Sequence, residues 1–131
     1  MEINLPDVVA EVKTVFERYE KALMSNDVAT LDALFNEDSR TVRYGSAENL
    51  YGFAEIKAFR AARSPAGLSR TLSKTLITTY GRDFAVASTL FHRSAATVGR
   101  QTQAWVRFPQ GWRVVAAHVS EIAAASLSRT R

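Results

Sequence analysis

A tyrosine and an arginine, Tyr19 and Arg43, offer the chemistry that this chain could use together. Tyr19 lies four residues after Val15 and four before Leu23, within a helical stripe of apolar residues, so its phenol is expected on the buried face. A cation close to that hydroxyl would stabilise the phenolate and make the phenol a better proton donor. The alternative is a core tyrosine whose hydroxyl bonds to a backbone carbonyl, and the spacing leaves both readings open.

Arg43 is the residue that could supply this cation. The stretch SRTVRYG, residues 39–45, favours extended backbone. Strand alternation puts Val42 and Tyr44 on one face and Arg43 on the other. The sequence does not say which face looks into the protein, so Arg43 is either an exposed strand residue or a cation in a pocket.

A second arginine, Arg63, continues the apolar face of another predicted helix, seven residues after Ile56 and four after Phe59. It either points at the mouth of a cavity or extends to solvent. Two arginines at one pocket would suit a ligand with two carboxylates, because a guanidinium binds a carboxylate through two parallel hydrogen bonds.

The last predicted strand carries His118 and Ser120. Alternation places them on the face of Trp112, Val114 and Ala116, and the apolar character of that face predicts that both lie inside. His118 is then either a hydrogen-bonded core histidine or a group that orients substrate or handles a proton. The opposite positions would form an apolar outer face: Val115, Ala117 and Val119.

Trp105 lies on the preceding strand, on one face with Gln103 and Arg107, as a pocket wall or an interface residue. The two histidines, His92 and His118, have no paired carboxylates nearby in the sequence, so no metal site is predicted.

The elements that must position these residues follow from periodicity. Apolar steps of three and four predict helices at about 5–24, 28–36 and 51–63. Strand-like runs occur at 40–44, 70–80, 84–93, 100–108 and 112–119. The stretch GSAEN is expected to be a loop, and residues 123–131 a flexible tail. The length of 131 residues fits one domain, 1–131.

Helices grouped in the first half and strands in the second predict an α+β fold. We expect a cone-shaped α+β barrel, in which three N-terminal helices pack on a strongly curved, mostly antiparallel sheet. Such a cone has a closed apolar bottom and an open mouth, which would hold a small molecule.

Composition and missing motifs exclude several functions. The net charge is +4, but the basic residues are scattered, and the excess at Arg60, Arg63 and Arg70 is interpreted as solvated charge, so no nucleic-acid partner is predicted. The absence of cysteine excludes disulfides and thiolate chemistry. No apolar run could span a bilayer and no secretion signal is evident, so a cytoplasmic protein without membrane contact is expected. Nucleotide-loop and hydrolase motifs are missing too.

Three stretches carry a family resemblance: LDALFNEDSRTVRYG, LYGFAEIKAFRAAR and QTQAWVRFPQGWRVVAAHVS. They resemble the SnoaL-like branch of the nuclear transport factor 2-like superfamily over residues 5–122. The pairing of Tyr19 with the RYG that begins at Arg43, FRAARSP at 59–65 and QTQAW is similar to the AtzH-like family. The resemblance implies a decarboxylating amidohydrolase of cyanuric-acid-type nitrogen catabolism, acting on a small carboxylated urea such as 1,3-dicarboxyurea.

By the same resemblance, Tyr19 and Arg43 are the catalytic pair. As substrate-binding candidates we add the following residues: Arg63, Ser64, Trp105, His118 and Ser120. No metal or cofactor is predicted, because protonation of the amide nitrogen is the step that carbamate breakdown needs.

Two other function classes stay open. The first is a non-catalytic module that binds small acids or associates through the outer face of the sheet, for which a homodimer or higher homo-oligomer is expected. The second is a polyketide-cyclase or isomerase-like enzyme. That chemistry uses a carboxylate base, and no acid is evident at the predicted cavity positions, since Glu37 and Asp38 lie in a helix-end loop.

Overall fold

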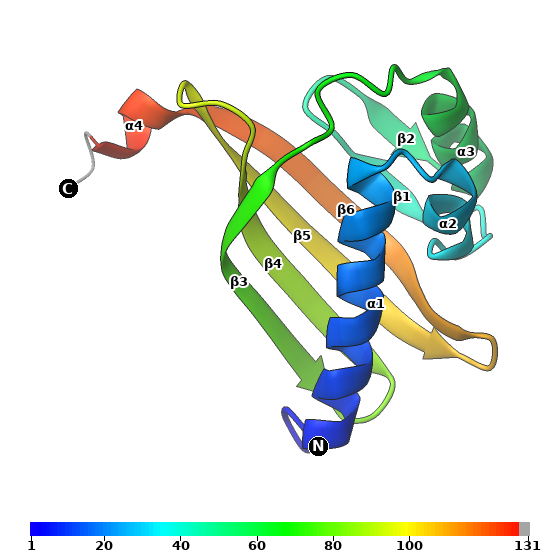
Figure 1. The fold of residues 1–131 in the computed structure, drawn as a ribbon. Coiled ribbons are helices and arrows are strands. Elements are labelled where there is room, and N and C mark those ends of the chain that lie inside the picture. Colours follow the sequence, from blue (N-terminus) through cyan, green and yellow to red (C-terminus); the bar gives the residue numbers. More distant parts are fainter. Residues whose placement is uncertain (129–131) are drawn as a thin grey trace.

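The structure, a computed structural model, describes residues 1–128 and consists of four helices and one six-stranded sheet within that range (Figure 1). The elements are, in chain order, α1 (Pro6–Met24), α2 (Val28–Ala33), β1 (Val42–Tyr44), β2 (Asn49–Tyr51), α3 (Phe53–Ala62), β3 (Thr71–Tyr80), β4 (Phe84–His92), β5 (Thr97–Phe108), β6 (Gly111–Ala123) and α4 (Ala124–Ser128). Among these helices, none has the length and apolar character that a membrane crossing requires.

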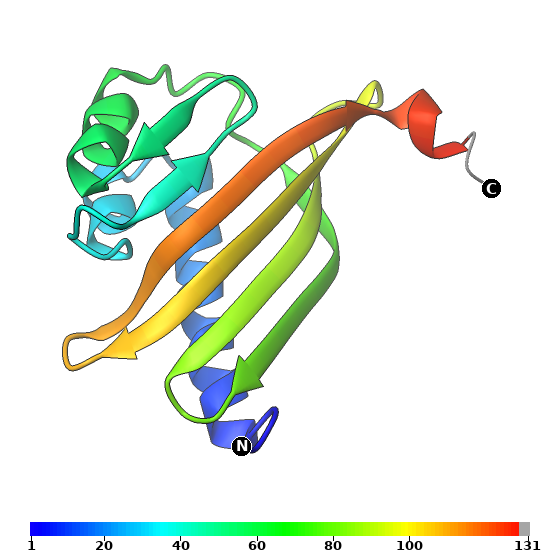
Figure 2. The same cartoon turned by 180° about the vertical axis from the view of Figure 1, so that it is seen from behind.

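The sheet has the strand order β2-β1-β6-β5-β4-β3, so the first strands of the chain lie next to the last. All neighbouring strands are antiparallel except β1 and β6, which are parallel. Helix α1 lies across one face of the sheet, and Figure 2 shows the strands in front of it when the molecule is seen from behind. Helices α2 and α3 and the β1–β2 hairpin gather at the end where α1 finishes.

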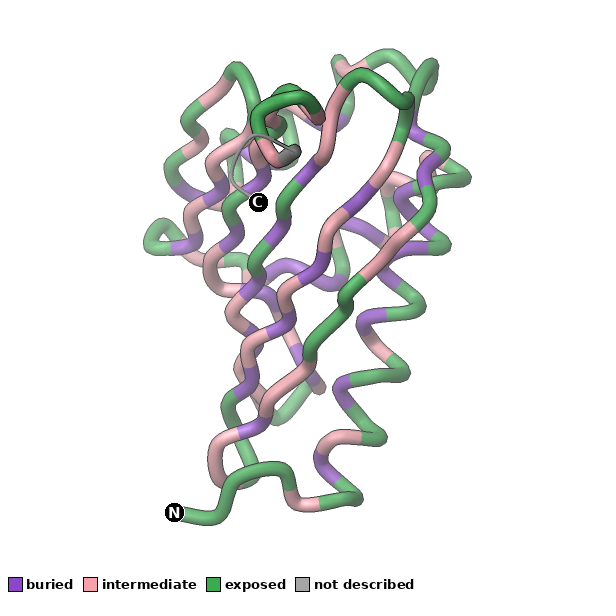
Figure 3. Tube along the Cα trace, turned by 90° about the vertical axis from the view of Figure 1, so that its left-hand side faces the viewer, coloured by how far each residue is buried: buried purple, intermediate pink, exposed green. Residues whose placement is uncertain are grey.

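Helix α1 is held to the sheet by its apolar stripe. Val8, Val12, Phe16 and Leu23 recur at steps that bring them to one side, and all are buried in the core. Figure 3 shows that the buried stretches of α1, in purple, lie on its side toward the strands. Pro6 occupies the first turn, where backbone N–H groups have no acceptor within the helix, so the absence of an N–H in proline costs no hydrogen bond.

The α+β prediction is confirmed, but three details differ. The sheet is open, with β2 and β3 as its edges, so the prediction of a barrel is wrong. The count of three helices is not confirmed either, because a further helix, α4, occupies part of the predicted tail 123–131. Residues 129–131 of that tail lie outside the described part of the chain. The short hairpin partner β2 was not predicted, since three residues are too few to display a period.

A single extra residue in β6 decides which side chains face the core. Ala104 of β5 pairs with Ala116, and Trp105 pairs with Val114, so Val115 is left between them as a β-bulge. The alternation of side chains reverses there, because a shift of one residue moves every later side chain to the opposite face. Beyond the bulge, the buried positions of β6 are Ala117 and Val119.

The packing of Phe91 on Gly99 gives a test of this core. The two residues pair directly across β4 and β5, and a Cβ added at Gly99 would lie 2.1 Å from the Phe91 ring. The ring is held between two guanidinium groups, at 4.5 Å from Arg70 and 4.9 Å from Arg93. We expect Gly99→Ala to reduce the free energy of unfolding by about 1–3 kcal/mol, measured by urea denaturation. In a Phe91→Leu background the penalty should shrink, and an equal penalty there would contradict this explanation.

Candidate functional site

One cross-strand row runs over the whole interior face of the sheet and contains Arg43. Strand pairing joins, from edge to edge, Leu50, Arg43, Ala117, Gln103, Ala87 and Ile77. Arg43 is only 8% exposed, and Ala117 and Ala87 belong to the core that also contains α1. Arg43 therefore lies on the face that looks toward α1, which answers the question that strand alternation leaves open.

Arg43 is anchored by Glu48 of the loop between β1 and β2. Its Nη1 donates to Glu48 Oε2 at 2.9 Å. A Cβ at Gly45 would lie 1.7 Å from that oxygen, so the carboxylate can take this place only because residue 45 is glycine. The remaining guanidinium nitrogens of Arg43 make no hydrogen bond within residues 1–128.

Arg63 ends α3 and brings a second cation close to Arg43. Both guanidinium groups lie over the same ring, that of Phe59, at 5.7 Å for Arg43 and 5.9 Å for Arg63. Nε and Nη2 of Arg63 are buried and have no hydrogen-bond partner in the described part of the chain. Burial, and next the neighbouring Arg43 charge, lower the pKa of Arg63 from its usual value. Arg63 as a whole is half-buried, and burial of these two unpaired nitrogens favours the binding of an anion.

Tyr19 is buried on α1, close enough to Arg63 for its charge to affect that arginine. It is 3% exposed, and its ring lies 6.2 Å from that of Phe35. The pKa of Arg63 is lowered by burial and by Arg43, and an ionised Tyr19 would raise it, so a phenolate at Tyr19 and the Arg63 cation would stabilise each other. The hydroxyl makes no hydrogen bond to another residue in the range 1–128. The expected core position on α1 is thus confirmed, while the backbone-bonded alternative is not observed.

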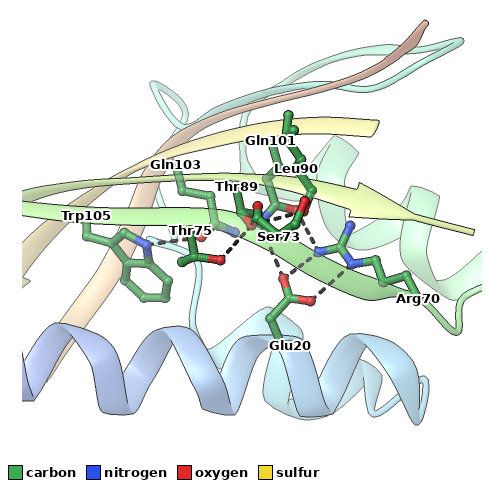
Figure 4. Close-up of polar contacts among 9 residues, drawn as sticks. All are labelled: Glu20, Arg70, Ser73, Thr75, Thr89, Leu90, Gln101, Gln103 and Trp105. Atoms are coloured by element: carbon green, nitrogen blue, oxygen red, sulfur yellow. Dashed lines mark hydrogen bonds and ion pairs between the residues drawn. The ribbon is translucent and has the colours of Figure 1, made fainter. Parts of the chain in front are cut away.

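Next to Tyr19 on α1, Glu20 takes part in a buried ion pair (Figure 4). Its carboxylate accepts hydrogen bonds from Arg70 Nε, at 3.0 Å, and from Arg70 Nη2. Gln101 completes the cluster, because its Oε1 accepts from Arg70 Nη2 at 2.9 Å and its Nε2 donates to Glu20 at 3.4 Å. The sequence analysis missed this cluster, although Glu20 follows Phe16 by four residues and so falls within the apolar stripe.

Arg60 is a further buried arginine. It lies 4.1 Å above the Phe35 ring and donates to Asp32 at 3.1 Å. Arg60 is 2% and Arg70 7% exposed, so the interpretation of these two as solvated charges is wrong. Stacking on an aromatic ring and pairing with a carboxylate compensate for the lost hydration of each guanidinium.

His118 and Ser120 do not face the core. Both follow the bulge at Val115, which turns them to the outer face, where Ser120 accepts a hydrogen bond from Arg100 and the His118 ring contacts that of Tyr44 at 5.9 Å. The prediction that both lie inside is therefore wrong. For the same reason Ala117 and Val119, expected on the outer face, are buried.

The other two predicted residues lie apart from the arginine pair. Ser64 is exposed, and its hydroxyl accepts from the Ala66 N–H within a turn. Trp105 is fully buried and donates from its indole nitrogen to Gln103 Oε1 at 3.1 Å, so it is a core residue that holds Gln103. Within residues 1–128, no three His, Asp or Glu side chains come together as metal ligands.

A separate groove runs between α1 and β3. It has a volume of about 580 Å³ and is lined by Val9, Lys13, Phe16, Glu17, Glu20, Lys21, Met24, Leu72, Thr75 and Ile77. Neither Tyr19 nor Arg43 lines it, so this groove is not the place where the predicted catalytic pair meets.

Comparisons with known proteins agree with this architecture. The family model named AtzH-like matches residues 1–125. A crystal structure of a protein of unknown function from Pectobacterium atrosepticum is 60% identical, with a TM-score of 0.90 over 92% of this chain and 94% of that one. A cystatin-like fold protein from Burkholderia xenovorans is 48% identical, with a TM-score of 0.90 over 94% and 98% of the two chains.

More distant similarity shows the fold alone. A nuclear transport factor 2-like protein of unknown function from Pseudomonas putida is 19% identical, with a TM-score of 0.71 over 85% of this chain and 84% of that one. None of the curated proteins matches the chain. The predicted resemblance to the AtzH-like family is confirmed, and the fold is that of the nuclear transport factor 2-like protein.

The buried Glu20–Arg70 pair gives a stability prediction. Arg70→Met leaves the Glu20 carboxylate buried without its cation, so we expect a loss of about 3–5 kcal/mol in the free energy of unfolding, measured by chemical denaturation. The control is Arg82→Met, which removes the exposed pair of Arg82 with Asp7 and should leave stability close to wild type. Equal effects of the two substitutions would refute the assigned role of burial.

Proposed function

Because the chain belongs to the AtzH-like family and brings Tyr19, Arg43 and Arg63 together, we propose that it is a small-pocket enzyme acting on a small carboxylated urea. The reaction is a decarboxylating cleavage of a C–N bond, and the substrate class is a 1,3-dicarboxyurea-like anion. The observation that carries the proposal is that two buried nitrogens of Arg63, Nε and Nη2, lack a partner in residues 1–128, while a second arginine lies over the same ring.

A carboxylate ligand is the chemistry that this arrangement favours. Burying a cation without an anion is unfavourable, and a second cation nearby increases the free energy further. Arg63 is proposed to bind the carboxylate that remains on the substrate, through the nitrogens that have no partner in the described chain. Arg43, kept in place by Glu48, is proposed to bind the other carboxylate and to stabilise negative charge as it develops during the reaction.

Tyr19 is proposed as the proton donor. In an N-carboxy urea, the bond between nitrogen and the carboxylate carbon breaks, the carbon leaves as CO₂, and the electron pair stays on nitrogen. The Tyr19 hydroxyl gives its proton to that nitrogen, and the phenolate recovers a proton from water. Until that proton returns, the positive charges of Arg43 and Arg63 stabilise the phenolate. An alternative role for the hydroxyl is to position a water for hydrolysis.

A second candidate function is a non-catalytic module that binds small acids. The same arginine pair would bind a carboxylate without turnover. This candidate includes a homodimer through the outer face of the sheet, which α1 leaves uncovered (Figure 2). The row on that face joins Val42, Ala116, Ala104 and Val86. Sedimentation of the wild type and an assay of CO₂ release separate the two candidate functions. A dimer that binds a dicarboxylate but releases no CO₂ would favour the non-catalytic module.

Substitution of Tyr19 tests the catalytic role. Tyr19→Phe should reduce kcat on 1,3-dicarboxyurea by about 100-fold or more, since the proton donor is lost, while the melting temperature stays near the wild-type value. Released CO₂ gives the rate. Tyr44→Phe is the control, because Tyr44 bonds to Tyr51 on the opposite face and should keep full activity. Normal turnover by the Tyr19 variant would remove it from the mechanism.

Arg63 gives a prediction for binding. Arg63→Met should weaken the binding of glutarate, a stable dicarboxylate, by about 10-fold or more in calorimetry. The melting temperature of this variant without ligand should not fall, because Arg63 has no acceptor within residues 1–128 that its removal would leave unpaired. Arg60→Met, the control, should melt lower, since it leaves Asp32 without its cation. Unchanged glutarate affinity in the Arg63 variant would argue against this carboxylate site.

A further inference from the structure

Gln103 carries a buried hydrogen-bond donor that no group in residues 1–128 uses. The residue is fully buried, and its Oε1 accepts from Trp105 Nε1 at 3.1 Å. This bond fixes which end of the amide faces Trp105, because an indole N–H can only donate. Nε2 therefore points away from Trp105, and it has no partner in the described chain (Figure 4).

The neighbouring glutamine on the same strand makes this observation specific. Gln101 lies two residues before Gln103 on the same interior face of β5. Both ends of its amide are engaged, with Arg70 and with Glu20. Both polar groups of the Gln101 amide are therefore hydrogen-bonded, whereas the Nε2 of Gln103 is not. Buried donors are rarely left without an acceptor.

Strand register places Gln103 on the same interior row as Arg43, with one strand between them. Gln103 and Arg43 both pair with Ala117, one from each side, so the two backbones lie two strand spacings apart, or about 10 Å. Ala117, the residue between them, contributes only a methyl group to this row. A ligand bound by Arg43 over Ala117 would therefore lie within reach of the Gln103 amide.

We propose that Gln103 Nε2 donates a hydrogen bond to a carbonyl oxygen of the bound ligand, between carboxylates bound by Arg43 and Arg63. This inference rests on the proposed function and adds a specificity-determining residue to it. The matching ligand is a dicarboxylate with a carbonyl at its centre. As the N–CO₂ bond of a carboxylated urea breaks, negative charge spreads onto that carbonyl, and a buried donor stabilises it.

Two stable ligands that differ only in the central carbonyl test the proposal, namely 3-oxoglutarate and glutarate. We expect the wild-type protein to bind 3-oxoglutarate about 10-fold more tightly than glutarate in calorimetry. In Gln103→Met the ratio should fall to about one, through loss of 3-oxoglutarate affinity, while glutarate affinity is retained. Gln101→Met, the matched control, should keep the wild-type ratio.

A second variant covers the case in which Gln103→Met does not fold. Gln103→Glu keeps an acceptor for Trp105 but replaces the donor, so it should bind 3-oxoglutarate no better than glutarate. Equal wild-type affinities for the two ligands would overturn the role of Gln103 while leaving the carboxylate site intact. If neither ligand binds to the wild type, the proposed function fails, and this inference fails with it. A preference for 3-oxoglutarate that persists in both variants would also overturn it.

Discussion

Val115 interrupts the pairing of β5 with β6, and the arrangement of the interior depends on this one residue. Before the bulge, Trp112 and Val114 point to the core; after it, Ala117 and Val119 do. Because β1 pairs with β6 beyond the bulge, the same shift puts Arg43 opposite Ala117 on the interior face. A regular strand would instead have turned His118 inward and Ala117 outward.

Buried arginines are the second theme of this fold, and aromatic rings accommodate them. Arg60 stacks on Phe35, Arg43 shares Phe59 with the half-buried Arg63, and Arg70 shares Phe91 with the exposed Arg93. A guanidinium is weakly hydrated and planar, so a ring face and a carboxylate together offset its lost water. Three of the arginines have such a carboxylate, namely Arg43, Arg60 and Arg70. Arg63 lacks one among residues 1–128, and this imbalance is the basis of the proposed anion site.

The fold alone does not explain this site. The sheet and α1 are shared with nuclear transport factor 2-like proteins at low identity, and such a scaffold supports unrelated activities. The proposed site depends instead on the set of side chains on one row of the sheet. Long polar residues, Arg43 and Gln103, alternate there with alanines, and Tyr19 of α1 and Arg63 of α3 lie near that row.

The sequence by itself determined the α+β class, the apolar stripe of α1 that buries Tyr19, and the family. These follow from local periodicity and from motifs that lie close together in the chain. Only the tertiary structure decided the direction of Arg43, the outward position of His118 and Ser120, and the open donors of Arg63 and Gln103. Their physical cause is long-range strand register, including the bulge at Val115, and the presence or absence of a partner from another element, neither of which is written in neighbouring residues.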